Sequence, residues 1–159
     1  MLLSSSSSCP PGSPRTVLFL CTGNYYRSRF AAIVFNHLAR QHALPWSASS
    51  RGLKIGWPGN HGALSPHTER RLAEMNINFD DSRHMPLQCR TCDLEEADFV
   101  VALKEEEHRA MLAEKFGGWE DHVTYWHVHD VDAAHPQDAL REIEERVREL
   151  VLELKRVID

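Results

Sequence analysis

The sequence predicts a single α/β domain built on a four-stranded parallel sheet flanked by helices. Three observations support this fold class. Short apolar runs recur along the chain, as expected for strands buried on both faces. Segments with apolar residues at helical spacing follow these runs. Strands that alternate with helices favour a parallel sheet, and 159 residues are enough for one such domain.

The chain begins with a segment that lacks the apolar residues needed for a core. Residues 1–15 hold five consecutive serines and a stretch rich in proline. Such low-complexity composition does not bury enough apolar surface to fold. We therefore expect a disordered N-terminal tail over residues 1–15 and a folded domain over residues 16–159.

The first half of the domain carries two strand–helix units. The apolar run at residues 17–20 predicts a central strand that ends at Cys21. Residues 28–40 space their apolar side chains as a helix with one buried face does. A weaker strand is expected at residues 47–54. Ser65 followed by Pro66 predicts the start of the next helix, because serine is a good N-cap and proline suits the first helical position.

The second half repeats the alternation. Residues 99–103 predict a third strand, residues 104–115 a charged helix and residues 123–128 a fourth strand. The last segment places Leu140, Ile143, Val147, Leu150, Val151 and Leu154 at helical spacing over several turns. This pattern predicts a long amphipathic helix lying on the sheet.

Composition and charge exclude several classes of protein. The net charge is −5 and no long basic run occurs, so a nucleic acid partner is disfavoured. No apolar stretch approaches the roughly 20 residues that span a bilayer, and the N-terminus lacks the apolar core of a secretory signal. The four cysteines do not form a dense disulfide pattern, so reduced thiols and a cytoplasmic location are expected.

Cys21 and Arg27 lie six residues apart in the connection between the first strand and the first helix. Backbone N–H groups in such a loop can converge on one anion, and the helix dipole adds positive charge at the helix N-terminus. The same field stabilises a thiolate, which makes Cys21 a candidate nucleophile. Arg27 fits as a bidentate clamp on two phosphate oxygens. The alternative for Cys21 is an inert buried thiol, which needs none of this context.

Other loop residues also suit a phosphate site. Gly23 permits close backbone approach, and the Asn24 side chain is expected to brace the loop by bonding to its backbone. Ser28 is expected to donate a hydrogen bond to the sulfur of Cys21. The predicted phosphate-binding residues of the loop, besides Cys21 and Arg27, are Thr22, Gly23, Asn24, Tyr25, Tyr26 and Ser28.

The loop sequence CTGNYYRS after VLFL resembles the low-molecular-weight protein tyrosine phosphatase family, whose loop reads Cys-x-Gly-Asn-x-x-Arg-Ser after an apolar strand. The family's Ser-x-Gly element is matched by residues 50–52, and its Ala-Asp-apolar run by residues 97–101. The resemblance spans residues 16–159 and is sharp at the loop. It implies the fold of phosphotyrosine protein phosphatase I and a catalytic domain over these residues.

Three residues near the loop depart from the family pattern or vary its pocket. Tyr26 replaces a second cysteine that many members carry, so a disulfide within the loop is not available. Arg29 replaces the usual proline. With Tyr25, these residues are expected to flank the pocket and change which substrates fit. Tyr25 and Trp57 are the specificity candidates.

The family uses an Asp, usually followed by Pro, as general acid in a loop after the fourth strand. Asp130 aligns best with it, because it follows the apolar strand end by the same short step. The missing Pro leaves Asp132 as a rival. A positioned acid protonates the leaving oxygen and then serves as base for the attacking water. A solvated loop Asp without a role is the alternative.

The implied reaction is hydrolysis of phosphotyrosine in proteins, or of small aryl phosphates, through a phosphocysteine and without a metal or other cofactor. His127, His129, Asp130 and Asp132 are the residues of an alternative metal site, for which no third firm ligand is identifiable. Two further functions stay open: thiol-dependent arsenate reduction on the same fold, and a phosphate-binding or phosphoprotein-binding module without turnover. Cys89 and Cys92 have redox spacing but are expected to be two loop thiols without a role. The sequence does not reveal the oligomeric state.

Overall fold

The computed structural model describes residues 15–56, 62–128 and 135–158. Four parallel strands form one sheet in the order β2-β1-β3-β4. They are β1 (Arg15–Cys21), β2 (Trp46–Gly52), β3 (Phe99–Ala102) and β4 (Thr124–Tyr125). The predicted fold class, an α/β domain with a four-stranded parallel sheet, is confirmed. β1 begins at Arg15, which pairs with Trp46, so the expected tail is one residue too long; residues 1–14 lie outside the described residues.

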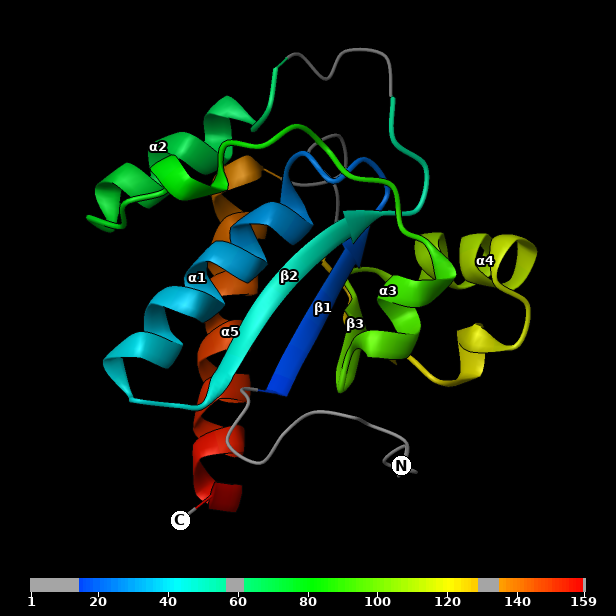
Figure 1. The fold of residues 1–159 in the computed structure, drawn as a ribbon. Coiled ribbons are helices and arrows are strands. Elements are labelled where there is room, and N and C mark those ends of the chain that lie inside the picture. The colour runs from blue at the N-terminus through cyan, green and yellow to red at the C-terminus, as the bar shows by residue number, and fades with distance from the viewer. Residues whose placement is uncertain (1–14, 57–61, 129–134, 159) are drawn as a thin grey trace.

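Helices cover both faces of this sheet (Figure 1). On one face lie α1 (Arg27–Gln41), α2 (Pro66–Glu74) and α5 (Pro136–Ile158). On the other lie the short α3 (Thr91–Glu96) and α4 (Glu105–Lys115). Two single 3-10 turns, η1 (Asp80–Ser82) and η2 (Trp119–Asp121), complete the described elements.

Alternate residues of β1 divide the core into two layers. Val17 and Phe19 pack against α1 and α5, whereas Leu18 and Leu20 pack against α3 and α4. Successive side chains of a strand point to opposite faces, so a strand buried on both sides must be apolar at every position. This explains why the run at residues 17–20 predicts the central strand correctly.

Ser65 and Pro66 begin α2 as predicted: the Ser65 hydroxyl accepts a hydrogen bond from His67 N at 3.2 Å. The fourth strand is shorter than the expected residues 123–128, because only Thr124 and Tyr125 pair with β3. Past β4 the chain still bonds to the sheet, through Trp126 N to Ala102 O at 2.9 Å and Val128 N to Leu103 O at 2.8 Å. The apolar run therefore continues beside the sheet beyond the strand itself.

Candidate active site

Cys21 lies at the carboxyl end of β1, the central strand that runs between β2 and β3. In parallel α/β sheets ligands bind beyond this end of the strands. The chain then passes through residues 22–26 into α1, whose N-cap residue Tyr26 makes no side-chain cap and whose first turn holds no acidic residue. The N-terminus of α1 thus keeps the positive end of its dipole toward the loop, a suitable environment for an anion.

The carbonyl groups of the loop are held by partners around it. The pairs are Cys21 O with Leu53 N (2.9 Å), Thr22 O with Lys54 N (2.9 Å), Asn24 O with Arg29 Nη1 (3.2 Å), Tyr25 O with Ser65 N (3.0 Å) and Tyr26 O with Phe30 N (3.1 Å). In a trans peptide the C=O and the following N–H point in opposite directions. The N–H groups that follow these five carbonyls therefore face away from these partners, as an oxyanion nest requires.

The thiol of Cys21 meets a hydroxyl from α1. Its Sγ lies 2.8 Å from Ser28 Oγ, and both residues are buried. Ser28 Oγ also accepts a hydrogen bond from Asn24 Nδ2 at 3.1 Å. An amide nitrogen only donates, so this contact leaves the Ser28 proton available for the sulfur. A hydrogen bond from Ser28 stabilises a thiolate at Cys21.

Asn24 connects the loop to two other segments. Its backbone adopts the left-handed conformation, with φ at 49°, which asparagine tolerates better than most residues. Its Nδ2 also donates to Ser50 Oγ at 2.9 Å, and its Oδ1 accepts from Leu87 N at 2.9 Å. The expectation that this side chain bonds to the backbone of its own loop is wrong, because its three polar contacts reach Ser28, β2 and residue 87.

Gly52 ends β2 directly opposite Cys21 in the sheet register. A Cβ at this position would lie 2.8 Å from Thr22 O and 3.0 Å from Asn24 N. Real Cβ atoms are not found that close to backbone atoms, so a side chain here would push the loop away. The element at residues 50–52 therefore serves the loop twice, through the Ser50 hydroxyl and through the missing side chain of Gly52.

Arg27 extends toward α4 and the chain after β4. Its Nη2 lies 3.1 Å from Glu107 Oε2, and its Nη1 donates to Val128 O at 3.3 Å. The Arg27 side chain is 3% exposed. These contacts hold its fork in a fixed position beside the loop, which is what a bidentate phosphate clamp needs.

Glu107 and His108 lie under the loop. Thr22 Oγ1 donates to Glu107 Oε1 at 2.7 Å and lies 3.2 Å from His108 Nε2. Burial would raise the pKa of Glu107, but the Arg27 guanidinium and the Thr22 hydroxyl hold it below its ordinary value. Burial and the repulsion of Arg27 lower the pKa of His108 to about 4. His108 is therefore neutral at pH 7, and Lys104 N donates to its Nδ1, which leaves its proton on Nε2, facing Thr22.

The structure brings most of the predicted site residues together and leaves three outside the described part of the chain. Cys21, Arg27 and the loop residues from Thr22 to Ser28 lie together at the carboxyl end of the sheet, and all of them except Gly23 and Tyr25 are buried. Asp130, its rival Asp132 and the specificity candidate Trp57 lie outside the described residues.

The three residues expected to flank the pocket differ in exposure. Tyr25 is half-buried. Tyr26 is buried, and its hydroxyl donates to Pro136 O at 3.2 Å. Arg29 is only 1% exposed. The expectation that Arg29 flanks the pocket is wrong, because its guanidinium points into the protein and bonds to carbonyl oxygens rather than to solvent.

Sequence reasoning missed Glu107 and His108, which it assigned only to a charged helix. One signal could have identified them. β3 pairs with β1, so the first turn of the helix after β3 must lie beside the loop after β1. A histidine and a carboxylate in that turn are candidates for contact with the loop.

Cys89 and Cys92 precede β3, as expected, but only Cys89 lies in a loop. Cys92 lies in α3, while Cys89 is buried just before this helix. Burial, with a smaller effect of Asp93, raises the pKa of Cys89 to about 12. Cys89 is consequently protonated at neutral pH and is a poor nucleophile.

The described residues hold neither a cluster of metal ligands nor a membrane-spanning helix. Within residues 15–56, 62–128 and 135–158, no group of three or more His, Cys, Asp and Glu is arranged to hold a metal ion. Of the alternative metal site, His127 is described, and the other three residues are not. Across the same part of the chain, no helix is both long and apolar enough to cross a membrane.

Two curated proteins of Bacillus subtilis are similar to this chain. The first, named protein-arginine-phosphatase, is 29% identical over 107 residues, which are 67% of each chain. The second, named low molecular weight protein-tyrosine-phosphatase YfkJ, is 32% identical over 93 residues, which are 57% of each chain. The two relatives thus bear names for different phosphorylated residues.

Solved structures share the fold over nearly the whole chain. The crystal structure of YfkJ from Bacillus subtilis has a TM-score of 0.79 at 22% identity and covers 94% of this chain and 100% of that one. A cysteine-to-serine mutant of the YwlE arginine phosphatase, with a phosphorylated active-site serine, has a TM-score of 0.73 at 26% identity and covers 88% and 95%. A thioredoxin-dependent arsenate reductase of Corynebacterium glutamicum shares the fold at 19% identity, with a TM-score of 0.69 and coverage of 93% and 65%.

A family model matches residues 16–158, almost the full length of the chain. Its match includes the loop, the Ser50 and Gly52 contacts and every strand after Arg15. The chain belongs to the family described as low molecular weight phosphotyrosine protein phosphatase.

Proposed function

We propose that this phosphatase hydrolyses phosphotyrosine in proteins, or small aryl phosphates, through a phosphocysteine at Cys21. The observation that carries the proposal is the geometry of the loop. The buried thiol of Cys21 lies beside the Ser28 hydroxyl, and the loop carbonyls are hydrogen-bonded to groups outside the loop. Arg27 is held in place at the N-terminus of α1. Fixed donors around a phosphoryl group stabilise the charge on its oxygens during transfer. No cofactor enters this mechanism.

The reaction proceeds in two displacements. The Cys21 thiolate attacks phosphorus, the P–O ester bond breaks, and its electron pair leaves with the oxygen, which takes a proton from Asp130. Water then gives a proton to the Asp130 carboxylate and attacks the phosphocysteine. The P–S bond breaks, and phosphate and the Cys21 thiolate are released. Arg27 and the loop N–H groups hold the phosphoryl oxygens through both steps.

Tyr25 supports an aromatic substrate. Tyr25 is half-buried, whereas the other side chains of the phosphate loop are buried. Its ring is therefore the group of the loop that is best placed to contact the part of the substrate attached to the phosphate. Aromatic rings pack favourably against one another in offset or edge-to-face geometry. An aryl phosphate can use such a contact, whereas an alkyl phosphate has no ring for it.

Protein phosphoarginine is a second candidate substrate, favoured by the name of one relative. A P–N bond is broken in that case, and the same thiolate and clamp serve it. Three substrates separate the possibilities: a phosphotyrosine peptide, a phosphoarginine peptide of the same sequence and a small aryl phosphate. We expect the highest kcat/KM for the phosphotyrosine peptide. A higher kcat/KM for the phosphoarginine peptide contradicts the aryl assignment while leaving the phosphatase reaction intact.

Arsenate reduction needs a second thiolate to attack an arsenylated Cys21. The raised pKa of Cys89 argues against that role for this thiol. Turnover with arsenate and a thiol reductant, followed by mass spectrometry, tests the point. We expect no disulfide between Cys21 and Cys89 or Cys92; its appearance contradicts the proposed function. A protein that binds phosphate but hydrolyses none of the three substrates is a binding module instead.

A further inference from the structure

Arg29 is a charged residue in the interior of the protein. It is the third residue of α1, and it is among the largest side chains with almost no exposed surface, at 1%. Among residues 15–56, 62–128 and 135–158 no carboxylate pairs with it. A buried charge without a counter-ion is costly unless hydrogen bonds compensate for lost water. The contacts of Arg29 therefore show what its burial achieves.

Its guanidinium bonds to four main-chain carbonyls from three separate segments. Nη1 donates to Asn24 O at 3.2 Å and to Ala63 O at 3.0 Å. Nη2 donates to Ser82 O at 2.5 Å and to His84 O at 2.8 Å. A planar fork with fixed donors can reach all four at once, which the single nitrogen of lysine does not reproduce.

The contact with Asn24 fixes one peptide of the phosphate loop. The carbonyl of Asn24 is turned toward Arg29, so the N–H of Tyr25 in the same trans peptide is turned the other way. The next carbonyl, Tyr25 O, accepts from Ser65 N at 3.0 Å. Arg29 and Ser65 thus orient two consecutive N–H groups in the middle of the loop.

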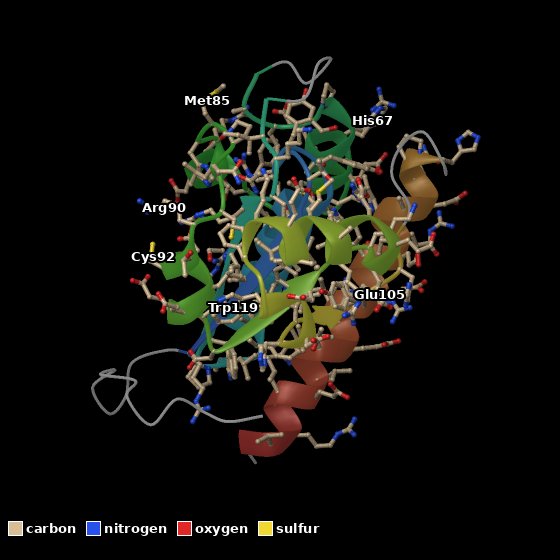
Figure 2. All side chains as sticks on the ribbon, turned by 90° about the vertical axis from the view of Figure 1, so that its right-hand side faces the viewer. His67, Met85, Arg90, Cys92, Glu105 and Trp119 are labelled. Atoms are coloured by element: carbon tan, nitrogen blue, oxygen red, sulfur yellow. The ribbon has the colours of Figure 1, made fainter. Side chains whose placement is uncertain are left out.

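The other contacts join the loop to the two segments beside it, which we call the walls: residues 62–65 and residues 82–87. From the loop side, the first wall is bound twice, through Ala63 O and Ser65 N. The second wall is bound three times, through Ser82 O, His84 O and Leu87 N. Figure 2 shows Met85 of the second wall and His67, just after the first, at the end of the molecule toward which the strands point. Arg29 lies at the junction of the loop and both walls.

The carbonyl partners of Arg29 are neutral, so its charge is not cancelled by them. Burial lowers the pKa of Arg29 below its ordinary value, and the nearby Cys21 partly opposes this shift. Arginine nevertheless stays protonated in proteins. A fixed positive charge close to Cys21 complements both a thiolate and a bound phosphoryl group.

We propose that Arg29 is a positioning residue for oxyanion binding: it orients the Asn24–Tyr25 peptide so that the Tyr25 N–H faces the phosphate, and it locks the loop to both walls. The proposal rests on the proposed function only in that the loop binds a phosphoryl group. A proline at this position, the usual residue of the family, has no side-chain donor and cannot make these contacts.

The test measures orthophosphate binding rather than turnover. The wild type, Arg29→Met and Arg29→Lys are labelled with ¹⁵N and titrated with orthophosphate, and Kd is read from the amide shifts. We expect the Tyr25 amide of the wild type to shift on binding. Arg29→Met is expected to weaken orthophosphate binding about tenfold and to diminish that shift. The Kd of Arg29→Lys is expected to lie between those of the wild type and Arg29→Met, because lysine keeps the positive charge but lacks the two-pronged guanidinium.

Val147→Ala provides a matched control. Val147 is fully buried on α5, in the core far along the chain from the loop. Its truncation is expected to lower Tm while leaving the Kd for orthophosphate within about twofold of the wild-type value. This control separates a loss of stability from a loss of loop geometry.

Several outcomes overturn the proposal. The first is an unchanged Kd for orthophosphate in a folded Arg29→Met variant. If the methionine variant does not fold, an unchanged Kd in Arg29→Lys has the same meaning. The third is a Val147→Ala variant whose orthophosphate binding is weakened as much as that of Arg29→Met. A wild-type protein that does not bind orthophosphate overturns both this proposal and the proposed function. A wild-type protein that binds orthophosphate without hydrolysing any substrate removes the proposed function alone, and the Kd values of the variants still decide the role of Arg29.

Discussion

Two cysteines flank Gly52 at the carboxyl end of the sheet, and each has 3% of its surface exposed. Cys21 lies beside a serine hydroxyl, in the loop that leads into a helix N-terminus, and near Arg29. Cys89 lies in an apolar cluster with Leu18, Leu20 and Leu53, and the pKa of its thiol is raised to about 12, chiefly by burial. Burial alone therefore does not decide the chemistry of a thiol. The reactivity of a buried thiol depends on the groups that replace water around its sulfur.

The first prediction removes each thiol in turn. Cys21→Ser is expected to lower kcat for an aryl phosphate on the order of 10⁴-fold, because serine at this position is a far weaker nucleophile. Cys89→Ala is the matched control and is expected to change kcat less than about twofold while costing some stability. Comparable losses of kcat in both variants contradict the distinction between the two sites.

The second prediction tests the clamp. Arg27→Lys keeps the positive charge but removes the fork that contacts Glu107 and Val128 O. We expect kcat/KM to fall roughly 10²-fold to 10³-fold, since fixed donors at the transition state are worth several kcal/mol. Arg51→Lys, a change on β2 outside the loop, serves as control. Arg27→Lys activity within a few-fold of wild type argues against bidentate binding.

The third prediction decides between the two candidate acids. Asp130→Ala is expected to lower kcat for a phosphate ester with a poor leaving group roughly 10²-fold, and less for a good one, because only a basic leaving group needs the proton. Asp132→Ala is expected to change kcat little. The reverse pattern assigns the acid to Asp132, and equal small effects remove general acid catalysis from the mechanism.

The fourth and smallest effect concerns the polar network under Cys21. The pKa of His108 is about 4 in the folded protein and near 6.5 when unfolded, so unfolding takes up a proton between these values. The folded state therefore loses stability as the pH falls from 6.5 to 4, by at most about 3 kcal/mol. His108→Gln removes this contribution.

Denaturant unfolding of wild type and His108→Gln at pH 7 and pH 5 measures the difference. We expect the free energy of unfolding of the wild type to fall more over this range than that of the variant. At pH 5 most carboxylates are still ionised, which keeps the comparison specific to histidine. Parallel losses in the two proteins show that His108 does not carry the effect.

Local sequence predicted the first strand, the loop and the first helix because each is encoded by neighbouring residues. The apolar run at residues 17–20 fixes a strand buried on both faces, and the spacing of Cys21 and Arg27 fixes the loop after it. The predicted length of the fourth strand is too great, since this length depends on how far β3 extends beside it. Helix α3 was missed because its six residues are too few for a helical period to stand out.

The role of Arg29 was beyond prediction from sequence for a different reason. Charged residues are mostly exposed, so an arginine after the loop is expected to face solvent. Its burial depends on three carbonyl-bearing segments, around residues 24, 63 and 83, that only the folded chain brings together. Glu107 and His108 became part of the site for the same reason, through the pairing of β3 with β1.

The most direct test is to locate the phosphoryl group during turnover. The wild-type protein is mixed with a phosphotyrosine peptide, quenched within milliseconds and mapped by mass spectrometry under conditions that preserve P–S bonds. We expect phosphate on Cys21 and on neither Cys89 nor Cys92. Hydrolysis without any phosphoenzyme, or with phosphate on another residue, contradicts the account of Cys21 as the nucleophile.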